Sequence, residues 1–61
     1  MINECDVFLL EDKWMHVVVS KRWLAGQHVY ELLALEGPTA GEIVLTFDSR
    51  LMNSARWTRL Q

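Results

Sequence analysis

Hydrophobic and polar positions alternate along this chain in short blocks, and turn-forming residues separate the blocks. The main breaks are residues 11–13, Gly26 and the segment 37–41, followed by residues 48–49 and 53–54. Clusters of Gly, Pro, Asp, Asn and Ser are typical of turns and loops. The blocks between them are short enough to be single strands. The pattern therefore predicts several strands joined by turns.

Two blocks near the start of the chain have the composition of strands. The segment from Cys5 to Leu10 is apolar at most positions, and the segment from Trp14 to Val19 ends in three consecutive valines. β-Branched residues lose side-chain freedom in a helix but pack well on a pleated sheet. We predict a strand in each segment.

The segment from Glu42 to Asp48 alternates between apolar and polar positions except at Val44. Ile43, Leu45 and Phe47 point to one side of an extended chain, and the polar residues point to the other. A period of two residues indicates a strand with one buried face. We expect Ile43, Leu45 and Phe47 to form one wall of the core.

Residues 28–36 are compatible with either a strand or a helix. Gly37 and Pro38 form a proper helix stop, and the segment contains good helix formers. In a helix, however, its apolar residues would circle the axis without forming a stripe. A strand places Tyr30, Leu32 and Ala34 on one face and Val29, Leu33 and Leu35 on the other. We favour the strand and keep the helix as the alternative.

Residues 49–60 also allow two interpretations. The first is a tight turn over residues 49–54 followed by a strand over residues 55–60. The second is a short helix that Asp48 or Ser49 caps and that continues through Leu51, Met52 and Ala55. We favour the turn and the strand.

These elements predict a mainly β fold in one small domain spanning residues 1–61. Four to five strands in a chain of this length fit a small antiparallel meander or a barrel of the SH3, Sm or OB kind. The alternative is an α+β fold in which one helix packs on a three- to four-stranded antiparallel sheet.

The two middle strands are apolar on both faces, which is unusual because antiparallel sheets commonly keep one face wet. Trp14 and Val18 point one way, and Met15, Val17 and Val19 point the other. Leaving such side chains in water forgoes roughly 1.5–3 kcal/mol each. We expect Met15, Val17 and Val19 to form a face that a second copy or a partner protein covers. A covering helix from the same chain is the alternative.

Size and composition support a folded domain that is only marginally stable alone. The chain has 61 residues, of which 51% are hydrophobic and 23% are charged. Domains this small bury only about 60% of the surface that the unfolded chain exposes. Cys5 is the only cysteine, so no disulfide can form within the chain. Self-association is therefore an expected means of stabilisation.

The N-terminal region has neither a basic segment nor a long apolar run. A secretory signal or a membrane span of about 18–20 apolar residues is therefore not expected, and the pattern predicts a cytoplasmic protein with no membrane partner. The net charge is −2, with acidic residues concentrated at the start and arginines at the end. These two regions can attract each other within one chain or between two copies. The alternative is a solvated surface of mixed charge.

The residues that usually carry catalysis or bind metals are sparse. His16 and His28 are the only histidines, and neither they nor Cys5 have the spacing of a metal site or a nucleophile pair. The glycines match no phosphate-binding loop, and the carboxylates are scattered. The sequence therefore predicts no enzyme activity, no cofactor and no metal.

Two tryptophans are flanked by basic residues. An aromatic ring between cations can stack on a nucleic-acid base while the cations contact phosphates. The acidic net charge opposes a general affinity for phosphate. This candidate binding surface consists of Lys21, Arg22, Trp23, Arg56, Trp57 and Arg59.

These observations favour a non-catalytic interaction or regulatory module, an inhibitor or adaptor that self-associates and binds another protein. Small bacterial and phage regulatory proteins have this general layout. The alternative is a module that binds single-stranded nucleic acid through Trp23 and Trp57 and the neighbouring basic residues.

Overall fold

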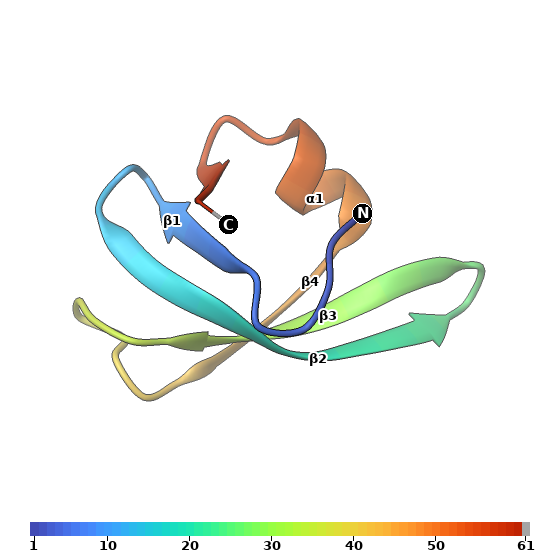
Figure 1. Ribbon diagram of the computed structural model, residues 1–61, viewed down its shortest axis with the longest axis horizontal. Coiled ribbons are helices and arrows are strands. Elements are labelled where there is room, and N and C mark those ends of the chain that lie inside the picture. The colour runs from blue at the N-terminus through green and yellow to red at the C-terminus, as the bar shows by residue number, and fades with distance from the viewer. Residues whose placement is uncertain (61) are drawn as a thin grey trace.

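Five antiparallel strands form one open sheet in the computed structural model, which describes residues 1–60 (Figure 1). The strands are β1 (Val7–Leu10), β2 (Trp14–Leu24), β3 (Gln27–Ala34), β4 (Ile43–Phe47) and β5 (Trp57–Arg59), and the helix α1 (Asp48–Asn53) joins β4 to β5. The order across the sheet is β4-β3-β2-β1-β5. The predicted mainly β fold with an antiparallel meander is confirmed.

The β1–β2 hairpin is closed by three residues, 11–13, and the β2–β3 hairpin by two, Ala25 and Gly26. Glu11 and Asp12 have φ angles of 53° and 56°, and Ala25 and Gly26 have φ angles of 52° and 81°. Positive φ at both central residues is the geometry of the type I′ turn, whose twist matches the twist of the flanking strands. The turns therefore fix the register of the β1–β2 and β2–β3 pairs.

The structure confirms most of the predicted strands and changes their limits. β2 extends beyond the predicted segment 14–19 to Leu24, and the segment 28–36 forms a strand rather than a helix only up to Ala34, where β3 ends. β1 begins only at Val7, because Cys5 lies in a turn with a φ angle of 75° and its N–H donates to the carbonyl of Val18.

The prediction for residues 49–60 is partly wrong. A helix of six residues forms where a turn was expected, and the final strand is confined to residues 57–59. No side chain caps the start of the helix, so neither Asp48 nor Ser49 acts as the predicted cap. Leu51 instead holds α1 in place by inserting into the core.

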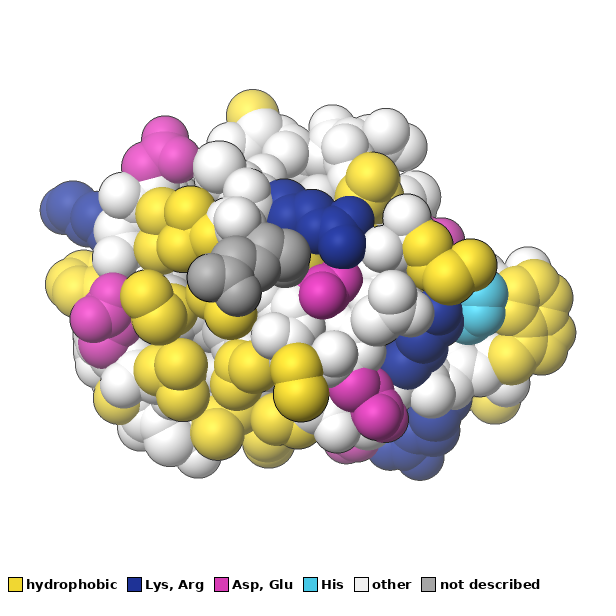
Figure 2. Space-filling model, in the orientation of Figure 1, with side chains coloured by type: hydrophobic (Ala, Val, Ile, Leu, Met, Phe, Trp, Pro, Cys, Tyr) yellow, Lys and Arg dark blue, Asp and Glu magenta, His cyan; other side chains and the backbone are white. Residues whose placement is uncertain are grey.

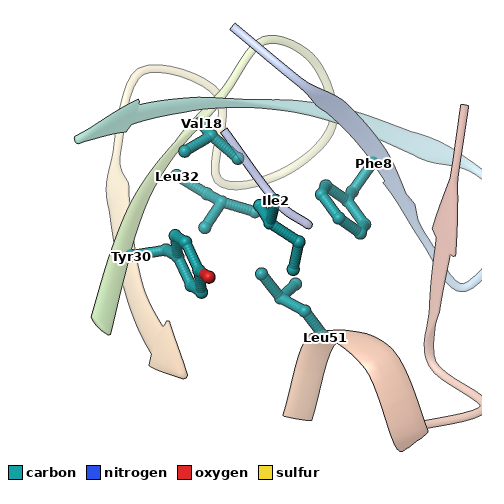
Figure 3. Close-up of a cluster of buried hydrophobic side chains, with 6 residues drawn as sticks. All are labelled: Ile2, Phe8, Val18, Tyr30, Leu32 and Leu51. Atoms are coloured by element: carbon teal, nitrogen blue, oxygen red, sulfur yellow. The ribbon is translucent and has the colours of Figure 1, made fainter. Parts of the chain in front are cut away.

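The core lies between the sheet, the N-terminal segment and α1 (Figures 1 and 3). The side of the sheet that faces α1 contributes four of its side chains, and Ile2 and Leu51 close it from the other side. Trp57 packs against this cluster from β5. The buried cluster consists of Ile2, Phe8, Val18, Tyr30, Leu32 and Leu51.

The expectation that Ile43, Leu45 and Phe47 line the core is wrong. Thr46 pairs with the buried Tyr30, and paired residues in an antiparallel sheet project from the same face. The polar side of β4 therefore faces inward, with Thr46 buried. Ile43 and Leu45 are exposed, and Phe47 is half-buried.

The acidic start and the basic end of the chain contact each other within one molecule. Arg59 Nη2 lies 2.7 Å from Asp6 Oδ2 and 3.0 Å from the carbonyl oxygen of Met1. Thr58 Oγ1 donates to Asp12 Oδ1 at 2.8 Å. These side-chain contacts attach β5 to the start of the chain, in addition to the backbone pairing of β5 with β1.

Candidate interaction surface on the outer face of the sheet

The strand register separates the sheet into a core side and an outer side. Val7 pairs with Val17, Val17 with Leu33, and Leu33 with Ile43, so four apolar side chains form one row across β1, β2, β3 and β4. Their neighbours in sequence, including Phe8 and Leu32, point to the core. The row therefore lies on the side of the sheet that faces away from the core.

More apolar residues lie beside this row on the same side. Leu9 pairs with Met15, and Leu45 pairs with Glu31. Ile43 is 52% exposed and Leu45 is 66% exposed. We call the following set the outer face: Val7, Leu9, Met15, Val17, Leu33, Ile43 and Leu45.

Within residues 1–60, α1 does not lie over the outer face, where Ile43 and Leu45 are exposed and the other five side chains are half-buried. α1 packs against β3, β4 and β5 on the core side, where Leu51 is buried. Figure 2 shows hydrophobic side chains gathered along the lower part of the molecule, below the strands and away from α1. Contiguous exposed apolar surface of this kind marks interaction sites on soluble proteins.

The structure places two of the three residues of the predicted oligomer face on this surface. Met15 and Val17 belong to the outer face and are half-buried. Val19 lies where the register between β2 and β3 shifts, so it occupies a bulge and is exposed. The contribution of β4 was missed, because its alternating pattern was assigned to the core.

The charged groups beside the outer face neutralise one another. Arg22 Nη2 lies 2.8 Å from Glu31 Oε1, and the Ser20 hydroxyl donates to the same oxygen at 2.6 Å. These hydrogen bonds from Ser20 and Arg22 hold the pKa of Glu31 below its ordinary value. A shallow hollow of about 240 Å³ lies next to this pair and is lined by Leu24 and Leu45, among others.

The proposed nucleic-acid surface is divided between two separate parts of the sheet. Trp23 is exposed near the tip of the β2–β3 hairpin, with its ring centroid 4.9 Å from that of His28. Trp57 is half-buried on β5 and contacts the core. Lys21, Arg22 and Trp23 therefore lie on β2, and Arg56, Trp57 and Arg59 lie on or next to β5.

Two of the cations in this set are already paired with carboxylates. Arg22 binds Glu31, and Arg59 binds Asp6. The structure thus does not assemble the six residues into one site, and Trp57 is held as part of the core.

The histidines and the cysteine lie apart from one another. His16 is buried on β2, and its Nδ1 donates to the carbonyl of Trp14 at 2.9 Å. Cys5 is exposed in the turn before β1. Within residues 1–60, no three His, Cys, Asp or Glu side chains gather as metal ligands would.

In the same part of the chain, no helix has the length and hydrophobicity to cross a membrane.

No protein-family model, curated protein or solved structure that was compared with the chain matches it. Two surface features of residues 1–60 provide a basis for inferring a function. One is the outer face, and the other is a cleft between β4 and β5.

Proposed function

We propose that this protein is a non-catalytic protein-interaction module and that its outer face packs against a second copy of the chain. The observation that carries the proposal is the apolar row from Val7 through Val17 and Leu33 to Ile43, in which Ile43 is exposed and the other three are half-buried. Each of four neighbouring strands contributes one side chain to it. A row of this kind matches the inner layer of a two-sheet sandwich.

Hydrophobic burial supplies the driving force for this association. Apolar surface removed from water stabilises a complex by roughly 25 cal/mol per Å², before the entropy of association is subtracted. Ile43 and Leu45 are more than half exposed and gain most from a facing sheet. Two such sheets pack about 10 Å apart with interdigitating side chains. A second copy thus covers the face that the short chain cannot cover alone.

The charges beside the outer face permit a symmetric contact. In a two-fold interface each surface meets its own copy, so an unpaired charge near the two-fold axis would meet the same charge on the partner. Arg22 and Glu31 neutralise each other within one molecule at 2.8 Å. The row itself contains no ionisable side chain. Two copies can therefore approach face to face without uncompensated charge.

In this proposal the dimer acts on another protein in the cytoplasm, as an inhibitor or adaptor. The outer edges of β4 and β5 and the exposed ring of Trp23 stay available when the outer faces are paired. Unpaired strand edges and exposed aromatic rings are common attachment points for partner proteins.

The contact between copies can be tested by mixing isotope-labelled and unlabelled protein and recording isotope-filtered NOE spectra. We expect intermolecular NOEs between methyl groups of Val17, Leu33 and Leu45. Met52 provides the control, because it is 55% exposed on α1, away from the outer face. Filtered spectra without intermolecular peaks, or with peaks only to Met52, would contradict the proposal.

A further inference from the structure

A second surface feature lies at the opening between β4 and β5, where the sheet does not close. It is a cleft of about 250 Å³. β4 contributes Val44 and Thr46, α1 contributes Arg50, and the end of the chain contributes Arg56 and Trp57. The cleft is thus built mainly from three consecutive elements, β4, α1 and β5, although β4 and β5 are the two edge strands of the sheet.

The cleft contains two arginines without a carboxylate partner. Arg22 and Arg59 form ion pairs, whereas in residues 1–60 neither Arg50 nor Arg56 does. The Arg50 guanidinium lies 5.5 Å from the centroid of the Phe47 ring, and this cation–π contact holds it beside the cleft. No acidic side chain lines the cleft. Its local charge is therefore positive in a chain whose net charge is −2.

The cleft also contains a buried hydroxyl group that lacks a partner. Thr46 lines the cleft, is only 4% exposed, and its Oγ1 forms no hydrogen bond. An unsatisfied buried polar group costs roughly 1–3 kcal/mol, so it calls for an explanation beyond folding. Because Oγ1 itself is buried, rotation of the Thr46 side chain would turn this hydroxyl toward a ligand oxygen in the cleft and give it a partner.

Trp57 provides a planar apolar wall. Its ring is held edge-on by Phe8, at a centroid distance of 6.4 Å, and by His16, at 5.0 Å. The side chain is half-buried and lines the cleft. A rigid indole surface favours stacking with a flat ligand, because little rotamer entropy is lost on binding.

From these four side chains we infer that the cleft between β4 and β5 binds a small organic anion. The ligand carries a carboxylate or phosphate group on a planar apolar body. Arg50 and Arg56 bind the anionic group through charge-assisted hydrogen bonds, which guanidinium groups form with these acids in bidentate geometry. Trp57 stacks on the planar body, and Thr46 hydrogen-bonds to a ligand oxygen.

The size of the cleft limits the ligand to a single ring with its acidic group. Pockets for drug-sized molecules are usually about 300–1,000 Å³, and this cleft is smaller. The cleft shares Leu45 with the outer face, but the two arginines, Thr46 and Trp57, which carry the inference, are not part of that surface. Either proposal can therefore fail without the other.

NMR titration of the ¹⁵N-labelled protein tests the inference, with phenyl phosphate and benzoate as probes. We expect a saturable shift of the Trp57 indole N–H resonance with at least one probe, and the stronger probe identifies the acid. Inorganic phosphate lacks the planar ring, and benzyl alcohol lacks the acidic group. Each should therefore bind at least tenfold more weakly. Equal shifts with benzyl alcohol, or none with either probe at millimolar concentration, would overturn the inference.

Variants separate binding from folding. Arg50→Gln and Arg56→Gln should each weaken binding of the stronger probe about tenfold, while Arg22→Gln, outside the cleft, should not change it. Thr46→Val removes the hydroxyl at constant shape and should weaken binding several-fold without lowering the melting temperature. Unchanged affinity in both cleft arginine variants, or a Thr46→Val variant that binds as the wild type does, would contradict the assignment.

Discussion

The hydroxyl of Tyr30 donates a hydrogen bond to Oδ1 of Asp48 at 2.6 Å and so links β3 to the first residue of α1. Tyr30 belongs to the buried cluster, and Leu51 enters the same cluster from α1. Burial of the ring, followed by the hydrogen bond and the negative charge of Asp48, raises the pKa of Tyr30 to about 12. The helix that closes the core is thus held by one polar and one apolar contact.

This link predicts a loss of stability in alkali. The pKa of Tyr30 is higher in the folded state than its unfolded value of about 10. Its contribution is therefore complete below about pH 10 and is lost as the pH rises toward about 12. Urea unfolding between pH 8 and pH 12 should show this decline in the free energy of unfolding.

Tyr30→Phe provides the control for the alkaline transition. At pH 8 it should lower the free energy of unfolding by about 1.5–3 kcal/mol, the usual contribution of a hydrogen bond to a charged group. Its stability should then change less than that of the wild type between pH 10 and pH 12. Parallel declines of the two proteins would show that Tyr30 is not the titrating group.

Alanine substitutions distinguish the two faces of the sheet. Leu32→Ala removes a fully buried side chain and should cost about 2–5 kcal/mol, enough to unfold most molecules of a domain this small. Leu45→Ala, at a 66% exposed position, should cost less than about 0.5 kcal/mol in a dilute, monomeric sample. Urea unfolding of both variants measures the difference. Equal losses would show that the register between β3 and β4 is wrong.

The sequence pattern predicted the strands but could not determine which side of β4 faces the core. Ile43, Leu45 and Phe47 lie on one side of β4 and Val44 and Thr46 on the other, and burial of the more apolar side is the usual outcome. The register with β3 decides otherwise, because Tyr30 pairs with Thr46 and Glu31 pairs with Leu45. The helix α1 was similarly missed because burial of Leu51, a tertiary contact, holds it without a capping side chain.

The two candidate surfaces differ in how far the sequence revealed them. The apolar positions on both sides of β2 and β3 indicated an additional face before the fold was known, including Met15 and Val17. The cleft depends on the tertiary fold, since β4 and β5 are the two edge strands of the sheet and only the folded chain brings Arg56 and Trp57 near Thr46. No local pattern in the sequence encodes that proximity.

The second hairpin can be stabilised by a single substitution in its turn. Ala25 has a φ angle of 52°, which is unfavourable for a residue with a Cβ atom, and it precedes Gly26. Ala25→Asn creates the Asn-Gly pair that type I′ turns prefer. We expect a gain of up to about 1 kcal/mol in the free energy of unfolding, measured in urea. A loss of stability would contradict the turn geometry.

Charged substitutions on the outer face should prevent self-association while leaving the fold intact. Ile43→Lys and Leu45→Lys each place a charge in the proposed contact and should weaken dimerisation at least tenfold, because a buried unpaired charge is costly. Met52→Lys is the matched control, since Met52 is similarly exposed but lies on α1. Size-exclusion chromatography with light scattering measures all three. A Met52→Lys variant that dissociates as readily as the other two would contradict the assignment of the face.

The most direct test of the proposed function is the mass of the wild-type protein in solution. One chain has a mass of 7.1 kDa. In sedimentation velocity over a range from low to high micromolar concentration, we predict that a species of twice this mass forms reversibly and dominates at the upper end. A single species of 7.1 kDa at every concentration would contradict the proposal that the outer face pairs with a second copy.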